Sequence, residues 1–167
     1  MATVWIIDSS SVIEAVRHDR VSREDRRVLL GGLTRLVDEG RLLSPPECCD
    51  EFERYGGTPN HALDWWMAHR DRCQRKASLV RVAEVLMRVP EILDERKDSG
   101  ADEADPYVLA LALDVATAGA DVRVITEERR TAVRKMSLAS AAGFLGLPAV
   151  DLRTMMKFEG ILSFDSR

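Results

Sequence analysis

The stretch Val4-Trp5-Ile6-Ile7-Asp8-Ser9-Ser10-Ser11 decides the fold class of this chain. Four consecutive apolar residues predict a β-strand buried on both faces, which is typical of a parallel sheet covered by helices. The strand ends on an aspartate, and the small hydroxyl residues after it can begin a helix. In open α/β sheets, ligands bind outside the carboxyl ends of the strands. Asp8 is therefore either a candidate functional carboxylate or simply the cap of the next helix.

The rest of the chain alternates between short apolar runs and segments of helical periodicity. Further strands are expected at residues 41–44, 122–125 and 149–150, and helices are expected after Asp8, at 22–39, 47–55, 59–71, 78–95, 106–118 and 138–145, and from Asp151 onward. Strand-then-helix order predicts an α/β fold with a central parallel sheet and helices on both faces.

Composition indicates one ordinary folded domain spanning residues 1–167, because 46% of the residues are hydrophobic and 31% are charged. We expect no membrane association, since no apolar run approaches the roughly 20 residues that a spanning helix needs. The N-terminus lacks the features of a signal peptide. Three cysteines without Cys-x-x-Cys spacing argue against a disulfide framework and a zinc site. Together these features predict a cytoplasmic protein.

Charge does not by itself indicate a nucleic-acid partner, because the net charge is −4. Local basic clusters do occur, and one of them comprises Arg129, Arg130, Arg134 and Lys135. A solvated surface is the simpler interpretation of such a cluster, and phosphate recognition is the alternative.

Carboxylates fall at equivalent places on this predicted sheet. They are Asp8 after the first strand, Glu51 in the helix after the second, Asp102 and Asp105 before the most apolar helix, and Glu127 and Glu128 after the strand at 122–125. Parallel topology can bring these positions together at one edge of the sheet.

Two of these carboxylates can be placed by local geometry. Glu51 borders the apolar face of its helix and is expected to be half-buried, with Glu47 one turn earlier as the alternative. Asp105 precedes Pro106, a residue suited to the first turn of a helix, so Asp105 is either a site residue or an N-cap.

Convergent carboxylates need a cation or a proton. Two like charges at about 4 Å repel by roughly 4 kcal/mol at an effective dielectric constant of 20. Oxygen ligands select Mg²⁺ or Mn²⁺, and a water retained by such an ion can become a nucleophile toward a phosphodiester.

Several segments together resemble the PIN-domain nucleases. Ile6-Ile7-Asp8-Ser9-Ser10 is similar to the opening strand of that family, and the segment 43–52 is similar to the one that supplies its second acid. The segment 104–112 resembles the helix of the third acid, and Val124-Ile125-Thr126-Glu127-Glu128 resembles the turn of the fourth. Glu128 stands where the family usually has aspartate, and Glu127 is the alternative at that position. The tail, residues 135–152, resembles a small PIN subfamily of uncharacterised function.

The resemblance implies a PIN-like three-layer α/β/α sandwich and a Mg²⁺- or Mn²⁺-dependent endoribonuclease. It implies Asp8, Glu51 and Asp105 as metal ligands, and Glu128 as the fourth catalytic acid. Ser10 and Thr126 would be supporting polar residues, as would Asp102 and Glu127. Many small bacterial members are VapC-like toxins of type II toxin–antitoxin pairs, which implies an RNA substrate, a cognate antitoxin and a homodimer.

Two rival functions stay open from the sequence. An Asp-centred phosphatase would typically carry a second aspartate two residues after the first, where this chain has Ser10. A degenerate PIN domain would bind RNA or a protein partner without cleavage, and the glutamate at position 128 is compatible with that alternative.

Overall fold

The computed structural model describes residues 1–17, 19–94 and 103–163, and it forms a three-layer α/β/α sandwich. The strands are β1 (Val4–Ile7), β2 (Leu42–Leu43), β3 (Val122–Ile125) and β4 (Ala149–Val150). The helices are α1 (Ser9–Val16), α2 (Arg23–Asp38), α3 (Cys48–Tyr55), α4 (His61–Cys73), α5 (Leu79–Arg88), η1 (Pro90–Ile92), α6 (Asp105–Thr117), α7 (Leu138–Phe144) and α8 (Leu152–Phe158). The predicted α/β class is confirmed.

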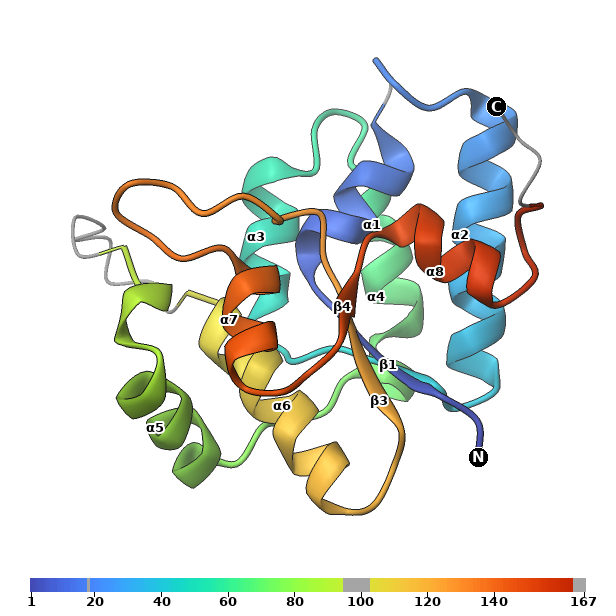
Figure 1. Cartoon of the computed structure of the whole chain (residues 1–167). Helices are drawn as coiled ribbons and strands as arrows, with labels where there is room; N and C mark the ends of the chain where they lie inside the picture. Colours follow the sequence, from blue (N-terminus) through green and yellow to red (C-terminus); the bar gives the residue numbers. More distant parts are fainter. Residues whose placement is uncertain (18, 95–102, 164–167) are drawn as a thin grey trace.

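The four strands pair in parallel in the order β2-β1-β3-β4. Helices α1, α2 and α8 lie on one side of the sheet, and α5, α6 and α7 lie on the other (Figure 1). β1 is central and fully apolar because it is covered on both faces, and Trp5 and Ile6 have no exposed surface. Because β2 and β3 flank β1 on opposite sides, the chain reverses its direction of winding at β1, and a crevice opens at the carboxyl ends of the strands.

One predicted helix was too long. The segment 78–95 was expected to be a single helix, but α5 ends at Arg88 and a separate 3₁₀ turn follows at Pro90–Ile92. Pro90 has no backbone N–H, and in a continuous helix its ring would clash with the carbonyl four residues earlier.

A close packing contact explains one glycine inside α2. A Cβ atom built on Gly32 would lie 2.8 Å from Ile161 Cδ1 and 2.9 Å from Met156 Sδ. The missing side chain therefore lets α8 and the residues after it approach α2. In the part of the chain that the structure describes, no helix is both long and apolar enough to cross a bilayer.

Candidate functional site

The carboxyl ends of β1 and β3 hold the centre of the site. Ile7 and Ile125 are paired at the last register position of these two strands. The next backbone amides continue the sheet: Asp8 N–H donates to Ile125 O at 3.0 Å, and Thr126 N–H donates to Val150 O at 3.0 Å. The sheet therefore fixes the backbone of both residues side by side, where the strand order reverses.

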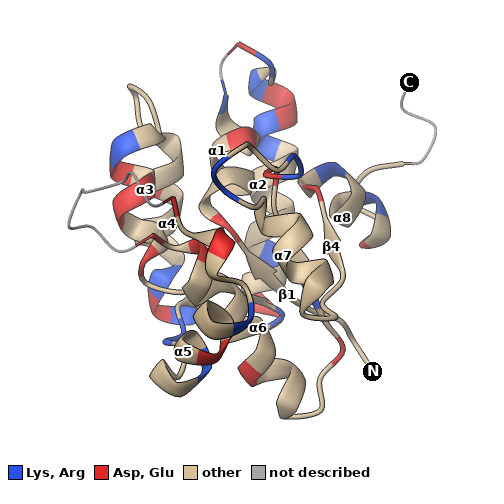
Figure 2. Cartoon of the chain, turned by 60° about the vertical axis from the view of Figure 1, so that its left-hand side comes forward, with Lys and Arg blue, Asp and Glu red and all other residues tan. Residues whose placement is uncertain are grey.

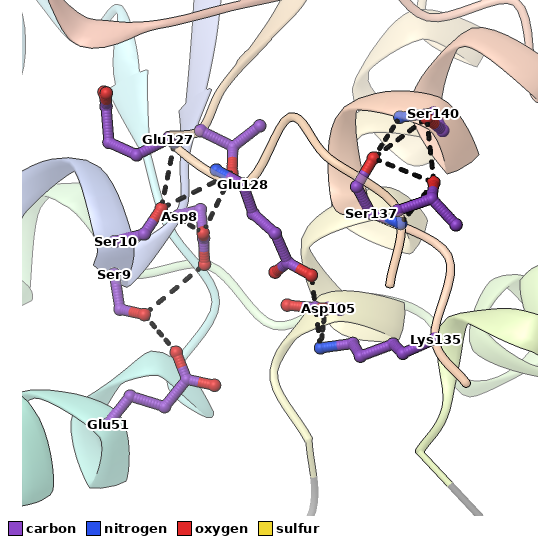
Figure 3. A network of polar contacts seen from close by, with 12 residues as sticks. Asp8, Ser9, Ser10, Glu51, Asp105, Glu127, Glu128, Lys135, Ser137 and Ser140 are labelled. Atoms are coloured by element: carbon purple, nitrogen blue, oxygen red, sulfur yellow. Dashed lines mark hydrogen bonds and ion pairs between the residues drawn. The ribbon is translucent and has the colours of Figure 1, made fainter. Parts of the chain in front are cut away.

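Asp8 is almost completely buried, and two hydroxyl groups hold its carboxylate (Figure 3). Ser10 Oγ donates to Asp8 Oδ2 at 2.6 Å, and Thr126 Oγ1 donates to the same oxygen at 3.1 Å. The same hydroxyls also accept hydrogen bonds from backbone amides of the turn after β3. Glu127 N–H donates to Ser10 Oγ at 3.1 Å, and Glu128 N–H donates to Thr126 Oγ1 at 3.0 Å. Ser10 and Thr126 thus orient both Asp8 and the turn that carries the last acids. Asp8 occupies the N-cap position of α1, but its side chain makes no capping hydrogen bond, so capping does not account for the buried carboxylate.

Glu51 reaches the same place from α3. It is half-buried, as its position on the helix predicted. The hydroxyl of Ser9 donates to Glu51 Oε2 and lies 3.4 Å from Asp8 Oδ1. One serine hydroxyl therefore lies between two carboxylates. Sequence reasoning singled out Ser10 and missed Ser9, whose side chain faces the neighbouring helix.

Asp105 and Glu128 form the other half of the site, together with Lys135. Asp105 is the first residue of α6, and the N-cap position belongs to Ala104, so the N-cap alternative for Asp105 is wrong. Lys135 Nζ lies 2.6 Å from Asp105 Oδ2 and 3.6 Å from Glu128 Oε1. Figure 3 shows Glu128 and Asp105 turned toward this ammonium group.

Glu127 points away from this group. Its Oε1 accepts from Leu152 N at 2.8 Å and from Ser11 Oγ at 3.3 Å, so it holds the start of α8. The structure therefore turns Glu128, and not Glu127, toward Asp105. Asp102, the remaining predicted polar residue, lies outside the described residues.

We call Asp8, Glu51, Asp105, Glu128 and Lys135 the carboxylate cluster. They line one cavity of about 370 Å³, to which Arg17 also contributes. Burial raises the pKa of Asp8 from 3.8 to about 8, with further contributions from the charges of Asp105 and Glu51. Burial also raises the pKa of Glu128, and the charge of Asp105 adds to this effect while Lys135 opposes it.

A family profile described as "Domain of unknown function (DUF4411)" matches residues 5–162. The chain belongs to the DUF4411 family. The matched segment runs from β1 past the end of α8 and therefore includes every member of the carboxylate cluster. No curated protein matches the chain.

The donor set of this DUF4411 site fits a hard divalent cation. Its groups are carboxylate and hydroxyl oxygens, which suit Mg²⁺ and Mn²⁺, and the acids that line the cavity outnumber its two cations, Lys135 and Arg17. Across residues 1–17, 19–94 and 103–163, no three His, Cys, Asp or Glu side chains are grouped closely enough to chelate an ion as they stand. Ligation would therefore require side chains of the cluster to move toward one another.

Lys135 is the member of the carboxylate cluster that the sequence left among surface charges. It was grouped with Arg129, Arg130 and Arg134, which are exposed in the loop before α7. Figure 2 colours all lysines and arginines blue. Lys135 is different, because only 20% of its side chain is exposed. The one local signal was its identity: the chain has 20 arginines and 4 lysines, and this lysine follows an arginine-rich run.

Proposed function

We propose that this chain is a Mg²⁺- or Mn²⁺-dependent endoribonuclease, and that it acts as the toxin of a bacterial type II toxin–antitoxin pair. The observation that carries the enzymatic part is the carboxylate cluster. Its four acids come from separate segments of the chain and line one cavity together with Glu14 and Glu127, against the two cations Lys135 and Arg17. The toxin part rests on the resemblance to VapC-like PIN domains.

The surplus of negative charge is the central physical argument. Carboxylates this close repel one another unless a cation or a proton neutralises them. The raised pKa of Asp8, to about 8, means that this buried acid takes up a proton when no ion is near. Such strongly shifted groups in a cavity are typical of functional sites.

Asp8, Glu51 and Asp105 are the residues that would hold the ion. Bound there, Mg²⁺ or Mn²⁺ would polarise a phosphoryl oxygen and activate a water for attack on the phosphodiester. Ser10 and Thr126 keep the Asp8 carboxylate facing the cavity, and Ser9 ties Glu51 to it. Glu128, with 34% of its side chain exposed, lies at the outer side of the cluster, where it can accept a proton.

The proposed partners follow from the same function. They are an RNA substrate, a cognate antitoxin and a second copy of the chain in a homodimer. Arg17 and Lys135 line the cavity and supply positive charge for a phosphate backbone next to the acids.

The decisive experiment is cleavage of labelled single-stranded RNA by the full chain in Mn²⁺, Mg²⁺ or EDTA. Asp8→Asn should reduce the rate by roughly 1,000-fold or more, since each ~1.4 kcal/mol of lost transition-state stabilisation is tenfold in rate. Asp38→Asn is the matched control, because Asp38 is an exposed acid paired with Arg72 away from the cavity. Equal cleavage by Asp8→Asn and wild type would refute the proposal.

The second candidate is a PIN-like domain that binds RNA or a protein without cutting it. The contact between Lys135 and Asp105 favours this alternative, because an ammonium group already neutralises one of the acids. RNA that is bound but left uncut in Mn²⁺, with equal affinity for wild type and Asp8→Asn, would establish the binding function.

A further inference from the structure

The loop before α7 places Lys135 with a defined backbone turn. Ala132 and Lys135 exchange backbone hydrogen bonds, from Ala132 N to Lys135 O at 3.0 Å and from Lys135 N to Ala132 O at 3.4 Å. On the far side of the lysine, Met136 N–H donates to Glu91 O at 2.7 Å, which ties the loop to η1. The backbone of Lys135 is thus anchored on both sides, and its entry into the cluster is part of the architecture.

The ammonium group itself contacts only part of the cluster closely. It lies 2.6 Å from Asp105, whose side chain is 5% exposed, and 3.6 Å from the more exposed Glu128. Asp8 and Glu51 are instead held by the hydroxyls of Ser9, Ser10 and Thr126. The cluster therefore has a hydroxyl-held half and an ammonium-held half.

Lysine is well suited to a contact that must be released. Its charge sits at the end of a flexible four-carbon stem, and it does not form the rigid two-point pair that arginine makes with a carboxylate. With a fifth of its side chain exposed, Lys135 has a path from the cavity to solvent.

We propose that Lys135 is an exchangeable counter-ion: its ammonium group holds Asp105 in the metal-free protein and must leave that carboxylate when a divalent cation binds. The inference rests on the carboxylate site proposed above. Two cations that share one buried carboxylate repel each other, so every binding event includes displacement of the lysine. Lys135 therefore weakens the affinity for the ion and sets the concentration at which the site fills.

The test is calorimetric titration of the metal-free full chain with Mn²⁺ alone, without RNA. Lys135→Met should bind Mn²⁺ roughly tenfold more tightly than wild type, because a competing charge is gone while most of the unbranched side chain is kept. Arg134→Met is the matched control. Arg134 is the exposed neighbour in the same loop and lines the adjacent cavity with Pro90 and Glu91, so its loss should change the affinity less than about twofold.

A second measurement protects the test against a folding defect. In EDTA, Lys135→Met should unfold at a lower temperature than wild type, because Asp105 loses its counter-ion. Saturating Mn²⁺ should then raise the midpoint more in Lys135→Met than in wild type.

The outcomes separate this inference from the proposed function. Equal or weaker Mn²⁺ binding by Lys135→Met would overturn the exchange, because the lysine would then organise the site and not compete for it. Absence of Mn²⁺ binding by all three proteins would overturn both the exchange and the metal site. Tighter binding by Lys135→Met, with no RNA cleavage by wild type, would support the exchange and count against the nuclease.

Discussion

The two ends of the sheet carry ionic clusters of opposite character. At the amino ends of the strands, Arg35 and Arg41 meet Glu39 and Glu159, a set that we call the Arg41 cluster. Arg41 binds both carboxylate oxygens of Glu159, at 2.8 and 2.6 Å, and Trp5 Nε1 adds a bond at 2.7 Å. The Arg41 cluster is electrically balanced, because two arginines face two glutamates. The carboxylate cluster at the carboxyl ends sets four acids against one lysine.

The difference appears as opposite pKa shifts. Hydrogen bonds from Arg41 hold the pKa of Glu159 below its usual range, whereas burial among other acids raises the pKa of Asp8 to about 8. A balanced cluster is complete without a ligand, and its role is to join α2, β1 and α8. A cluster with surplus negative charge needs a proton or a cation, and the metal site that we propose would supply the cation.

The largest expected effect comes from breaking the balanced cluster. Arg41→Met should lower the free energy of unfolding by about 2–3 kcal/mol, because it leaves the largely buried Glu159 carboxylate without its main donor. Urea denaturation measures this change, and Mn²⁺ affinity should stay that of wild type. Arg72→Met, which breaks the exposed pair with Asp38, should cost less than about 1 kcal/mol. Equal losses in the two variants would show that the Arg41 cluster is no more than surface charge.

The next prediction concerns how the raised pKa of Asp8 makes the stability of the fold depend on pH. The native pKa of Asp8, about 8, exceeds the unfolded value of 3.8, so between these values the folded state holds a proton that the unfolded state has released. Stability from this group is therefore full below pH 4 and is lost as pH rises toward 8. Asp8→Asn cannot lose stability in this way, so without divalent ions its free energy of unfolding should exceed that of wild type by an amount that grows from pH 5 to pH 8. A difference that does not grow from pH 5 to pH 8 would contradict the raised pKa.

A smaller effect follows from supplying the missing cation. Mn²⁺ at about ten times its Kd should stabilise the wild type by about 1.4 kcal/mol, or roughly 3–5 °C in Tm. Mn²⁺ should stabilise Arg41→Met as much as it stabilises the wild type, and it should stabilise Asp8→Asn much less. A thermal scan with and without the ion makes the comparison, and an unchanged wild-type Tm would remove the distinction between the clusters.

The smallest effect separates members of the carboxylate cluster. Glu128→Gln should weaken Mn²⁺ binding only two- to threefold, because Glu128 is a third exposed and already near Lys135. Glu51→Gln should weaken it more, since the Ser9 bond directs Glu51 toward Asp8. Titration calorimetry measures the Mn²⁺ affinity of both variants. A larger loss of affinity in Glu128→Gln than in Glu51→Gln would place the ion at the ammonium-held half of the cluster.

The sequence was informative where the structure depends on local pattern. The run at 4–7 predicted the central strand, and its position predicted that Asp8 would lie at the strand end beside the turn at Thr126. The half-buried Glu51 followed from helical periodicity alone. These features depend on few residues and on the edge rule for parallel sheets.

The features that the sequence missed depend on contacts between distant segments. Lys135 meets Asp105 only because a turn at 132–135 is tied to η1, and no periodicity encodes that turn. Ser9 joins Glu51 to Asp8 through the packing of α1 against α3, which an isolated Ser-Ser-Ser run does not specify. The early end of α5 was visible in Pro90, and the hydrophobic pattern that continues past it concealed the break.

The central position of β1 also governs when the site can form during biosynthesis. Asp8 leaves the ribosome early, but the hydroxyl of Thr126 that holds it lies 118 residues later in the chain. Lys135 emerges later still, and β4, which completes the sheet beside β3, follows at Ala149. A nascent chain therefore cannot bring its acids into a shared cavity until Thr126 and β4 have been synthesised. If the protein cuts RNA, it cannot do so before the ribosome has synthesised β4.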